Sequence, residues 1–192
     1  MTRPWRAWQR RRIREKLAAL ELLVLDVDGV LTDGGLWFSP EGQLQKRFDV
    51  RDGLGIRLLQ QAGLALAFLS GGQGGATEIR AQQLGIKHCL VGIKDKPKAL
   101  AQLQHDLGVA PKRTGFIGDD LNDLAVRGQI GLLLTPADAC DAVRRQADWV
   151  LSRNGGHGAV REAAEAILSS RGSWTSLRRH GWRDQNDWTQ KP

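Results

Sequence analysis

The sequence predicts an α/β protein, a three-layer sandwich built on a mainly parallel, Rossmann-like sheet. The first observation is a continuous apolar run at Leu22–Leu25, which is typical of a strand buried on both faces. The second is that further strand-like runs alternate with helical stretches along the chain. The 192 residues are enough for one domain of ordinary size with a substantial core.

The first strand ends in two carboxylates, Asp26 and Asp28, and Gly29 then allows a sharp turn. Ligands of open α/β sheets bind beyond the carboxyl ends of the strands. Two crowded acids repel each other unless a cation or a shared proton relieves them, and hard oxygen ligands suit Mg²⁺. The first acid can attack phosphorus and the second can transfer a proton. The alternative from this motif alone is a pair of turn or capping residues.

A β-hairpin is expected next, and it would protrude from the sandwich. Apolar Leu36–Phe38 precede the turn residues Ser39–Gly42, and a second strand is expected over Leu44–Val50. The apolar face of this hairpin has no evident partner in the chain, so we expect it to contact another subunit.

A phosphate cradle is expected after the second sheet strand, at 64–69. A helix precedes this strand, with Asp52 as its expected N-cap and its end near Gly63. The strand leads to Ser70 and Gly71, and a helix follows over 76–84. A hydroxyl and free backbone N–H groups at a helix start suit phosphate, although these glycines also fit a simple turn.

Lys96 lies between a strand expected at 87–91 and a helix expected at 97–107. A cation at a helix start does not favour the helix dipole. A phosphate or carboxylate partner for Lys96 is therefore the better explanation.

A second acidic cluster, GDDLND at 118–123, follows the strand expected at 114–117. Two acidic clusters on one sheet edge are hard to explain structurally, because each requires a cation. The remaining elements are predicted as helix 122–127, strand 130–134, helix 136–145, strand 149–151 and a final helix ending near Ser169.

The termini carry the positive charge of the chain. Residues 1–16 have a net charge of +6 and residues 171–192 of +3, so the segment between them has −2. We expect a mobile arm at 1–12, a helix from Arg12 to Leu20 and no pattern beyond Arg171. Basic residues with tryptophans can bind RNA, but nothing else resembles a nucleic-acid module, so solvated tails are favoured. These tails hold Trp5, Trp8, Trp174, Trp182 and Trp188.

Other classes of protein are disfavoured. No apolar run reaches the ~18 residues that span a bilayer, and the basic N-terminus lacks the apolar segment of a secretory signal. Cys89 and Cys140 have no metal-binding spacing, and we expect no disulfide between them. The sequence favours a cytoplasmic enzyme.

The motifs together resemble the haloacid dehalogenase superfamily of phosphotransferases. The resemblance rests on DVDGV at the first strand, Ser70, Lys96 and GDDLND, in that order. Within the superfamily, residues 20–170 are most similar to the 3-deoxy-D-manno-octulosonate 8-phosphate phosphatases, through LLVLDVDGVLTDG, FDVRDGLGIRLL, GDDLND and GGHGAVRE. Such proteins lack a cap domain and form tetramers through the hairpin.

This resemblance implies a division of the chain and roles for its residues. It implies a basic arm at 1–18, a phosphatase domain at 19–170 and a basic tail at 171–192, with the hairpin at 33–50 in the subunit contacts. The implied roles in catalysis are nucleophile for Asp26, proton transfer for Asp28 and charge compensation for Lys96. Mg²⁺ would be bound by Asp26, Asp28 and Asp119, while Asp120 and Asp123 would bind metal waters or orient Lys96. The phosphoryl group would be bound by Ser70 and Gly71, and the rest of the substrate by Arg51 and Asp52.

One position departs from the family pattern. Members acting on the octulosonate phosphate usually have Thr-Gly-Arg where this chain has Ser70, Gly71 and Gly72. Arginine suits a substrate carboxylate, so another cation, Arg51, Arg80 or a tail arginine, would have to compensate. The alternatives are a phosphatase for a nine-carbon or neutral sugar phosphate, or a phosphoacceptor domain with little turnover. Asp28 favours turnover.

Overall fold

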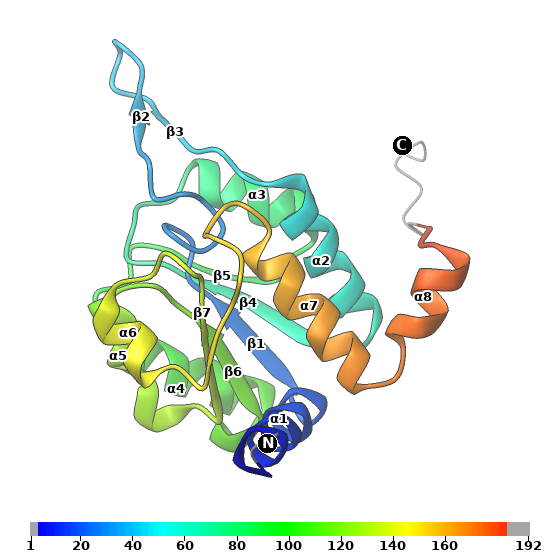
Figure 1. The fold of residues 1–192 in the computed structure, drawn as a ribbon. Coiled ribbons are helices and arrows are strands. Elements are labelled where there is room, and N and C mark those ends of the chain that lie inside the picture. The colour runs from blue at the N-terminus through cyan, green and yellow to red at the C-terminus, as the bar shows by residue number, and fades with distance from the viewer. Residues whose placement is uncertain (1–3, 184–192) are drawn as a thin grey trace.

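The computed structural model of the protein describes residues 4–183 (Figure 1). Within that range one sheet has six parallel strands in the order β5-β4-β1-β6-β7-β8. Their bounds are β1 Leu22–Leu25, β4 Ala65–Leu69, β5 His88–Leu90, β6 Thr114–Ile117, β7 Leu132–Thr135 and β8 Trp149–Val150. The central strand β1 pairs Leu25 with Phe68 on one side and with Ile117 on the other. This confirms the predicted sheet.

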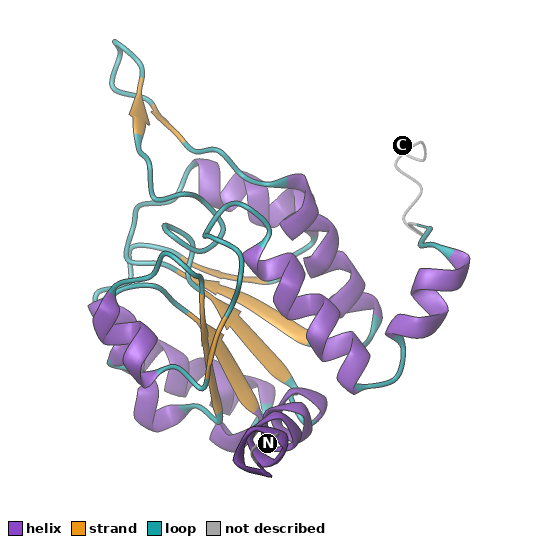
Figure 2. Ribbon diagram, in the orientation of Figure 1, coloured by secondary structure: helices purple, strands orange, loops and turns teal. Residues whose placement is uncertain are grey.

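Helices cover both faces of the sheet and complete the three layers (Figure 2). Leu23 and Leu25 face one core, while Leu22 and Val24 face the other, which explains the unbroken apolar run. The first core packs against α1 Pro4–Ala18, α2 Val50–Gln61, α3 Ala76–Leu84, α7 Ala159–Ser170 and α8 Trp174–His180. The second packs against α4 Lys96–Leu107, α5 Leu121–Leu124 and α6 Asp141–Gln146, and 3₁₀ turns occupy Pro111–Arg113 and Arg127–Gln129.

The predicted hairpin is present and projects beyond the sandwich at the top of Figure 1. It pairs β2, Trp37–Phe38, with β3, Leu44–Gln45, in antiparallel register. The exposed fractions of Leu36, Trp37 and Phe38 are 53%, 67% and 66%. Its second strand is shorter than predicted, because the chain already becomes helical at Val50.

The prediction that Asp52 is the N-cap of the following helix was wrong. Asp49 is the N-cap of α2, where the backbone is still extended, and its side chain accepts the N–H of Arg51 at 2.7 Å. Asp52 is buried and accepts the N–H groups of Gly158 at 3.1 Å and Arg161 at 2.8 Å. Asp52 thus satisfies free donors at the start of α7 and joins that helix to α2.

Both described ends of the chain contain helix that the sequence did not indicate. The first helix was expected to begin near Arg12, whereas α1 begins at Pro4. Beyond Arg171, α8 forms, and Trp174 lies 5.5 Å below the guanidinium of Arg161. Arg171 donates to the carbonyls of Ala62 and Leu20. The tail prediction that includes Trp188 lies outside the described residues.

No helix between residues 4 and 183 is both long and apolar enough to cross a membrane. Cys89 and Cys140 are both free thiols, in agreement with the expected lack of a disulfide.

Candidate active site

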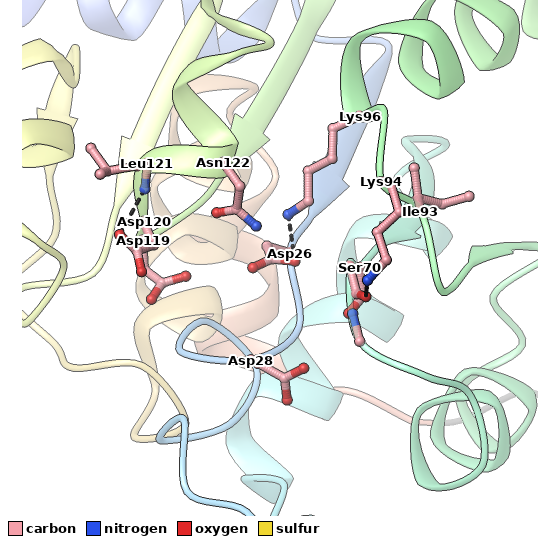
Figure 3. Close-up of a pocket in the computed structure, with 12 residues that line it drawn as sticks. Asp26, Asp28, Ser70, Ile93, Lys94, Lys96, Asp119, Asp120, Leu121 and Asn122 are labelled. Carbon is pink, nitrogen blue, oxygen red and sulfur yellow. Dashed lines mark hydrogen bonds and ion pairs between the residues drawn. The ribbon is translucent and has the colours of Figure 1, made fainter.

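The carboxyl ends of four neighbouring strands meet around one cavity of about 520 Å³ (Figure 3). β1 leads to Asp26, β4 to Ser70, the loop after β5 to Lys96, and β6 to Asp119. The cavity is lined by Asp26, Asp28, Ser70, Gly71, Gly72, Ile93, Lys94, Lys96, Asp119, Asp120, Leu121 and Asn122. The sheet therefore brings together the polar groups that the sequence placed at separate strand ends.

Asp26 forms a buried ion pair with Lys96 beside a third charged group, Asp123. The Nζ of Lys96 lies 2.9 Å from Oδ1 of Asp26 and 2.6 Å from Oδ1 of Asp123. Burial and then the charge of Asp123 raise the pKa of Asp26 to about 6, although Lys96 opposes this shift. Burial disfavours charge on Lys96, but the carboxylates of Asp26 and Asp123 outweigh it and raise the pKa of this lysine.

Asp123 pairs with Lys96 and also binds the loop after β6. Its Oδ2 accepts the backbone N–H of Asp119 at 2.9 Å and that of Asp120 at 3.3 Å. Gly118 is required here, because a Cβ at this position would overlap the Asp123 carboxylate. Asp120 accepts the N–H of Leu121 at 2.7 Å and caps α5. Of the two acids, Asp123 is the one that touches Lys96.

Asp119 has a buried carboxylate oxygen without a hydrogen bond, as does Asp28, whose Oδ1 is ion-paired with Lys46. In Asp119 this oxygen is Oδ1, which has no hydrogen-bond partner among residues 4–183. Burial, and then the charges of Asp26, Asp123 and Asp120, raise the pKa of Asp119 to about 8. One carboxylate oxygen each from Asp26, Asp119 and Asp123 lies within 4.8 Å of the other two. Hard, crowded, partly unsatisfied oxygens fit a divalent cation.

The loop after β1 closes against this acidic group. Gly29 adopts φ +85°, and a Cβ there would overlap the Asp119 carboxylate. Glycine is thus needed both for the turn and for the close approach of the two loops.

Ser70 lies opposite the acids, at the end of β4. It is buried, and its Oγ accepts the N–H of Gly72 at 3.1 Å. Lys94 is exposed and donates to the carbonyl of Gly71 at 3.3 Å. Sequence reasoning missed Lys94, two residues before Lys96, and Asn122, which lies within the GDDLND motif; both line the cavity.

The sequence also gave no role to Lys46, which follows β3 in the hairpin. Its Nζ lies 2.7 Å from Oδ1 and 2.9 Å from Oδ2 of Asp28, and 3.3 Å from Oγ1 of Thr77. No local pattern in the sequence signals this contact with Asp28.

The other residues that the sequence suggested for substrate binding, Arg51, Asp52 and Arg80, do not line this cavity. Arg51 pairs with Asp49 at 2.6 Å and lines a second cavity of about 480 Å³ with Arg153 and Arg161. Asp52 is buried under α7, and the guanidinium of Arg80 lies 5.8 Å from the ring of Phe48. Arg51 and Asp52 therefore do not line this cavity, and substrate binding by them stays a prediction.

Comparison with known proteins decides the family. No protein-family model matches the chain. The 3-deoxy-D-manno-octulosonate 8-phosphate phosphatase of Haemophilus influenzae is 40% identical over 147 residues, which cover 77% of this chain and 82% of that protein. The chain belongs to this phosphatase family, within the haloacid dehalogenase superfamily. Its relative from Yersinia pestis is also 40% identical, over 76% of this chain and 78% of that protein.

Solved structures of the family share the fold. The Moraxella catarrhalis phosphatase, in complex with a magnesium ion, a phosphate ion and a KDO molecule, has a TM-score of 0.85 and 36% identity over 88% of this chain and 97% of that one. A putative subfamily III A hydrolase of the haloacid dehalogenase superfamily from Legionella pneumophila has a TM-score of 0.87 and 36% identity, covering 91% and 96%. The protein is a phosphoric monoester hydrolase.

Proposed function

We propose that the protein is a Mg²⁺-dependent phosphatase that hydrolyses 3-deoxy-D-manno-octulosonate 8-phosphate through an aspartyl-phosphate on Asp26. The observation that carries this proposal is the placement of Asp26. Its carboxylate faces the cavity, held by Lys96, while Asp28 lines the same cavity two residues further on. A nucleophile and a proton donor so placed fit hydrolysis in two steps.

The acidic group fits the cation that the fold family uses. Asp26, Asp119 and the backbone carbonyl of Asp28 would hold Mg²⁺, and the unsatisfied Oδ1 of Asp119 is the oxygen most in need of it. When bound, the ion offsets the negative charge of the phosphoryl oxygens.

The residues of the chain perform both steps. A carboxylate oxygen of Asp26 bonds to phosphorus, the ester P–O bond breaks, and Asp28 gives its proton to the leaving alkoxide. Asp28 then takes a proton from water, which attacks the aspartyl-phosphate and frees Asp26 and phosphate. Ser70 and the N–H of Gly71 hold the phosphoryl oxygens, and Lys96 offsets their charge.

A sugar-acid substrate also needs a cation for its carboxylate. The exposed Lys94 lines the cavity next to Gly71 and is the candidate within one chain. Because a charge-assisted bond contributes about 1.5–3 kcal/mol, Lys94→Met should raise KM for the octulosonate phosphate roughly tenfold or more. KM for an aryl phosphate, which has no carboxylate, should stay nearly unchanged.

A panel of phosphate monoesters tests the function. With Mg²⁺, we expect the highest kcat/KM for the octulosonate 8-phosphate, and no turnover with a chelator. Preference for a nine-carbon or neutral sugar phosphate would establish that alternative instead. Stable phosphorylation of Asp26 with little release of phosphate would indicate a phosphoacceptor domain.

Assembly and location are proposed as well. The exposed Leu36, Trp37 and Phe38 support a homotetramer formed through the 33–50 hairpin. The two free thiols, Cys89 and Cys140, are consistent with a cytoplasmic location.

A further inference from the structure

The hairpin is tied to the cavity by the buried side chain of Lys46. Only 1% of this side chain is exposed, although the hairpin itself projects into solvent. The ammonium touches both carboxylate oxygens of Asp28, at 2.7 and 2.9 Å, and the hydroxyl of Thr77 at 3.3 Å. Burying an ammonium costs free energy unless it is paired. The two carboxylate oxygens of Asp28 and the hydroxyl of Thr77 supply that pairing here.

The neighbouring glycine leaves room for this ion pair. A Cβ at Gly72 would lie 2.8 Å from Oδ2 of Asp28 and 3.6 Å from Nζ of Lys46. Asp28 itself is on a loop, and 31% of its side chain is exposed. Among residues 4–183, Lys46 is the cation that pairs with Asp28, so its loss would leave this carboxylate without a charged restraint.

We propose that Lys46 is a positioning residue for Asp28, and that the hairpin is thereby part of the active site. This inference rests on the proposed phosphatase function, in which Asp28 protonates the leaving group. A proton donor must lie within about 2.6–3.2 Å of the oxygen that it protonates, so a carboxylate free to rotate donates less often. Asp28 lines the cavity (Figure 3), and its contact with Lys46 restrains the carboxylate there.

The test compares leaving groups. The leaving oxygen of an alkyl phosphate needs a proton. The leaving group of p-nitrophenyl phosphate is nitrophenolate, a stable anion that needs none. For Lys46→Met we expect kcat on the alkyl phosphate to fall about tenfold or more, since proton transfer by a positioned acid contributes ~10²–10⁴-fold. On the aryl phosphate, the first-turnover burst of nitrophenolate should change less than about twofold, because the first step needs no proton from Asp28 there; the alkyl-to-aryl ratio is taken against this burst. Loss of both activities in parallel, or of neither, would overturn the inference.

Two further variants serve as controls. Thr77→Val removes the hydroxyl that contacts the ammonium, and it should lower the alkyl-to-aryl ratio less than Lys46→Met does. An unchanged ratio for Thr77→Val counts against the inference even if Lys46→Met does not fold. Arg47→Met is the matched control, because Arg47 follows Lys46 but contacts Gly156 and Asp33 instead of Asp28. An equal fall in its ratio would also refute a specific role for Lys46.

The unmodified enzyme separates the two claims. If it hydrolyses both esters with Mg²⁺ and the ratio is insensitive to Lys46, only the inference fails. If it hydrolyses neither these esters nor the octulosonate 8-phosphate, the proposed function fails and the inference fails with it.

Discussion

The Nζ of Lys96 lies 2.6 Å from Oδ1 of Asp123, although the two residues are 27 positions apart in the chain. Both side chains are almost fully buried, with exposed fractions of 3% and 0%. The bond joins the first residue of α4 to α5, and it holds the ammonium 2.9 Å from Asp26. The arrangement of the nucleophile therefore depends on an ion pair between two other elements.

Replacing Lys96 with Met should disrupt both function and stability. Breaking a buried pair and leaving two carboxylates without a cation typically costs about 3–5 kcal/mol. We expect kcat to fall at least ~10²-fold, since compensation of phosphoryl charge is lost. Phosphate release and thermal unfolding measure the two effects. Lys98→Met, an exposed change on the same helix, should alter neither; a Lys96 variant with normal kcat would remove this residue from the mechanism.

Asp28→Asn tests the proton transfer directly. The amide has nearly the shape of the carboxyl group but cannot supply its proton. Turnover of an alkyl phosphate should fall by ~10²-fold or more. Formation of the aspartyl-phosphate from an aryl phosphate should be less affected, which a burst of nitrophenolate would reveal. An unchanged steady-state rate on the alkyl ester would assign the proton transfer to another group.

The exposed apolar side chains of the hairpin lead us to predict self-association. The double change Trp37→Ser and Phe38→Ser removes two exposed aromatic side chains whose exposed fractions are 67% and 66%. We expect light scattering to show a tetramer for the unmodified protein at micromolar concentration and smaller species for the variant. A monomeric unmodified protein would contradict the assembly.

Asp52→Ala distinguishes a structural role from substrate binding. The carboxylate accepts two backbone N–H groups at the start of α7, so its loss leaves buried donors unsatisfied. We expect the free energy of unfolding to fall by about 2 kcal/mol. KM and kcat of the folded fraction should remain the same. A large rise in KM without loss of stability would restore Asp52 to the substrate site.

Local sequence patterns were sufficient for the elements that carry the chemistry. The apolar run Leu22–Leu25 predicted the central strand with its bounds, because a strand buried on both faces leaves no polar position inside it. Asp26, Ser70, Lys96 and Asp119 were predicted at one sheet edge, since parallel strands share the direction of their carboxyl ends. These relationships follow from the period and polarity of the chain.

Contacts between distant segments could not be predicted in the same way. Asp49 and Asp52 are both good capping residues, and only the packing of α7 decides that Asp49 caps α2. Lys46 reaches Asp28 because the hairpin folds back onto the loop after β1, which nothing near Lys46 indicates. The helix α8 depends on tertiary packing of Trp174 and Leu177 more than on its own pattern.

The role of Asp26 as nucleophile is tested most directly by phosphate release from the octulosonate 8-phosphate with Mg²⁺, measured for the unmodified protein and for Asp26→Asn. The amide keeps the shape of the side chain but cannot form the aspartyl-phosphate. We predict steady turnover by the unmodified protein and none above background by the variant, with both folded by circular dichroism. Full activity of the folded Asp26→Asn protein would contradict the mechanism.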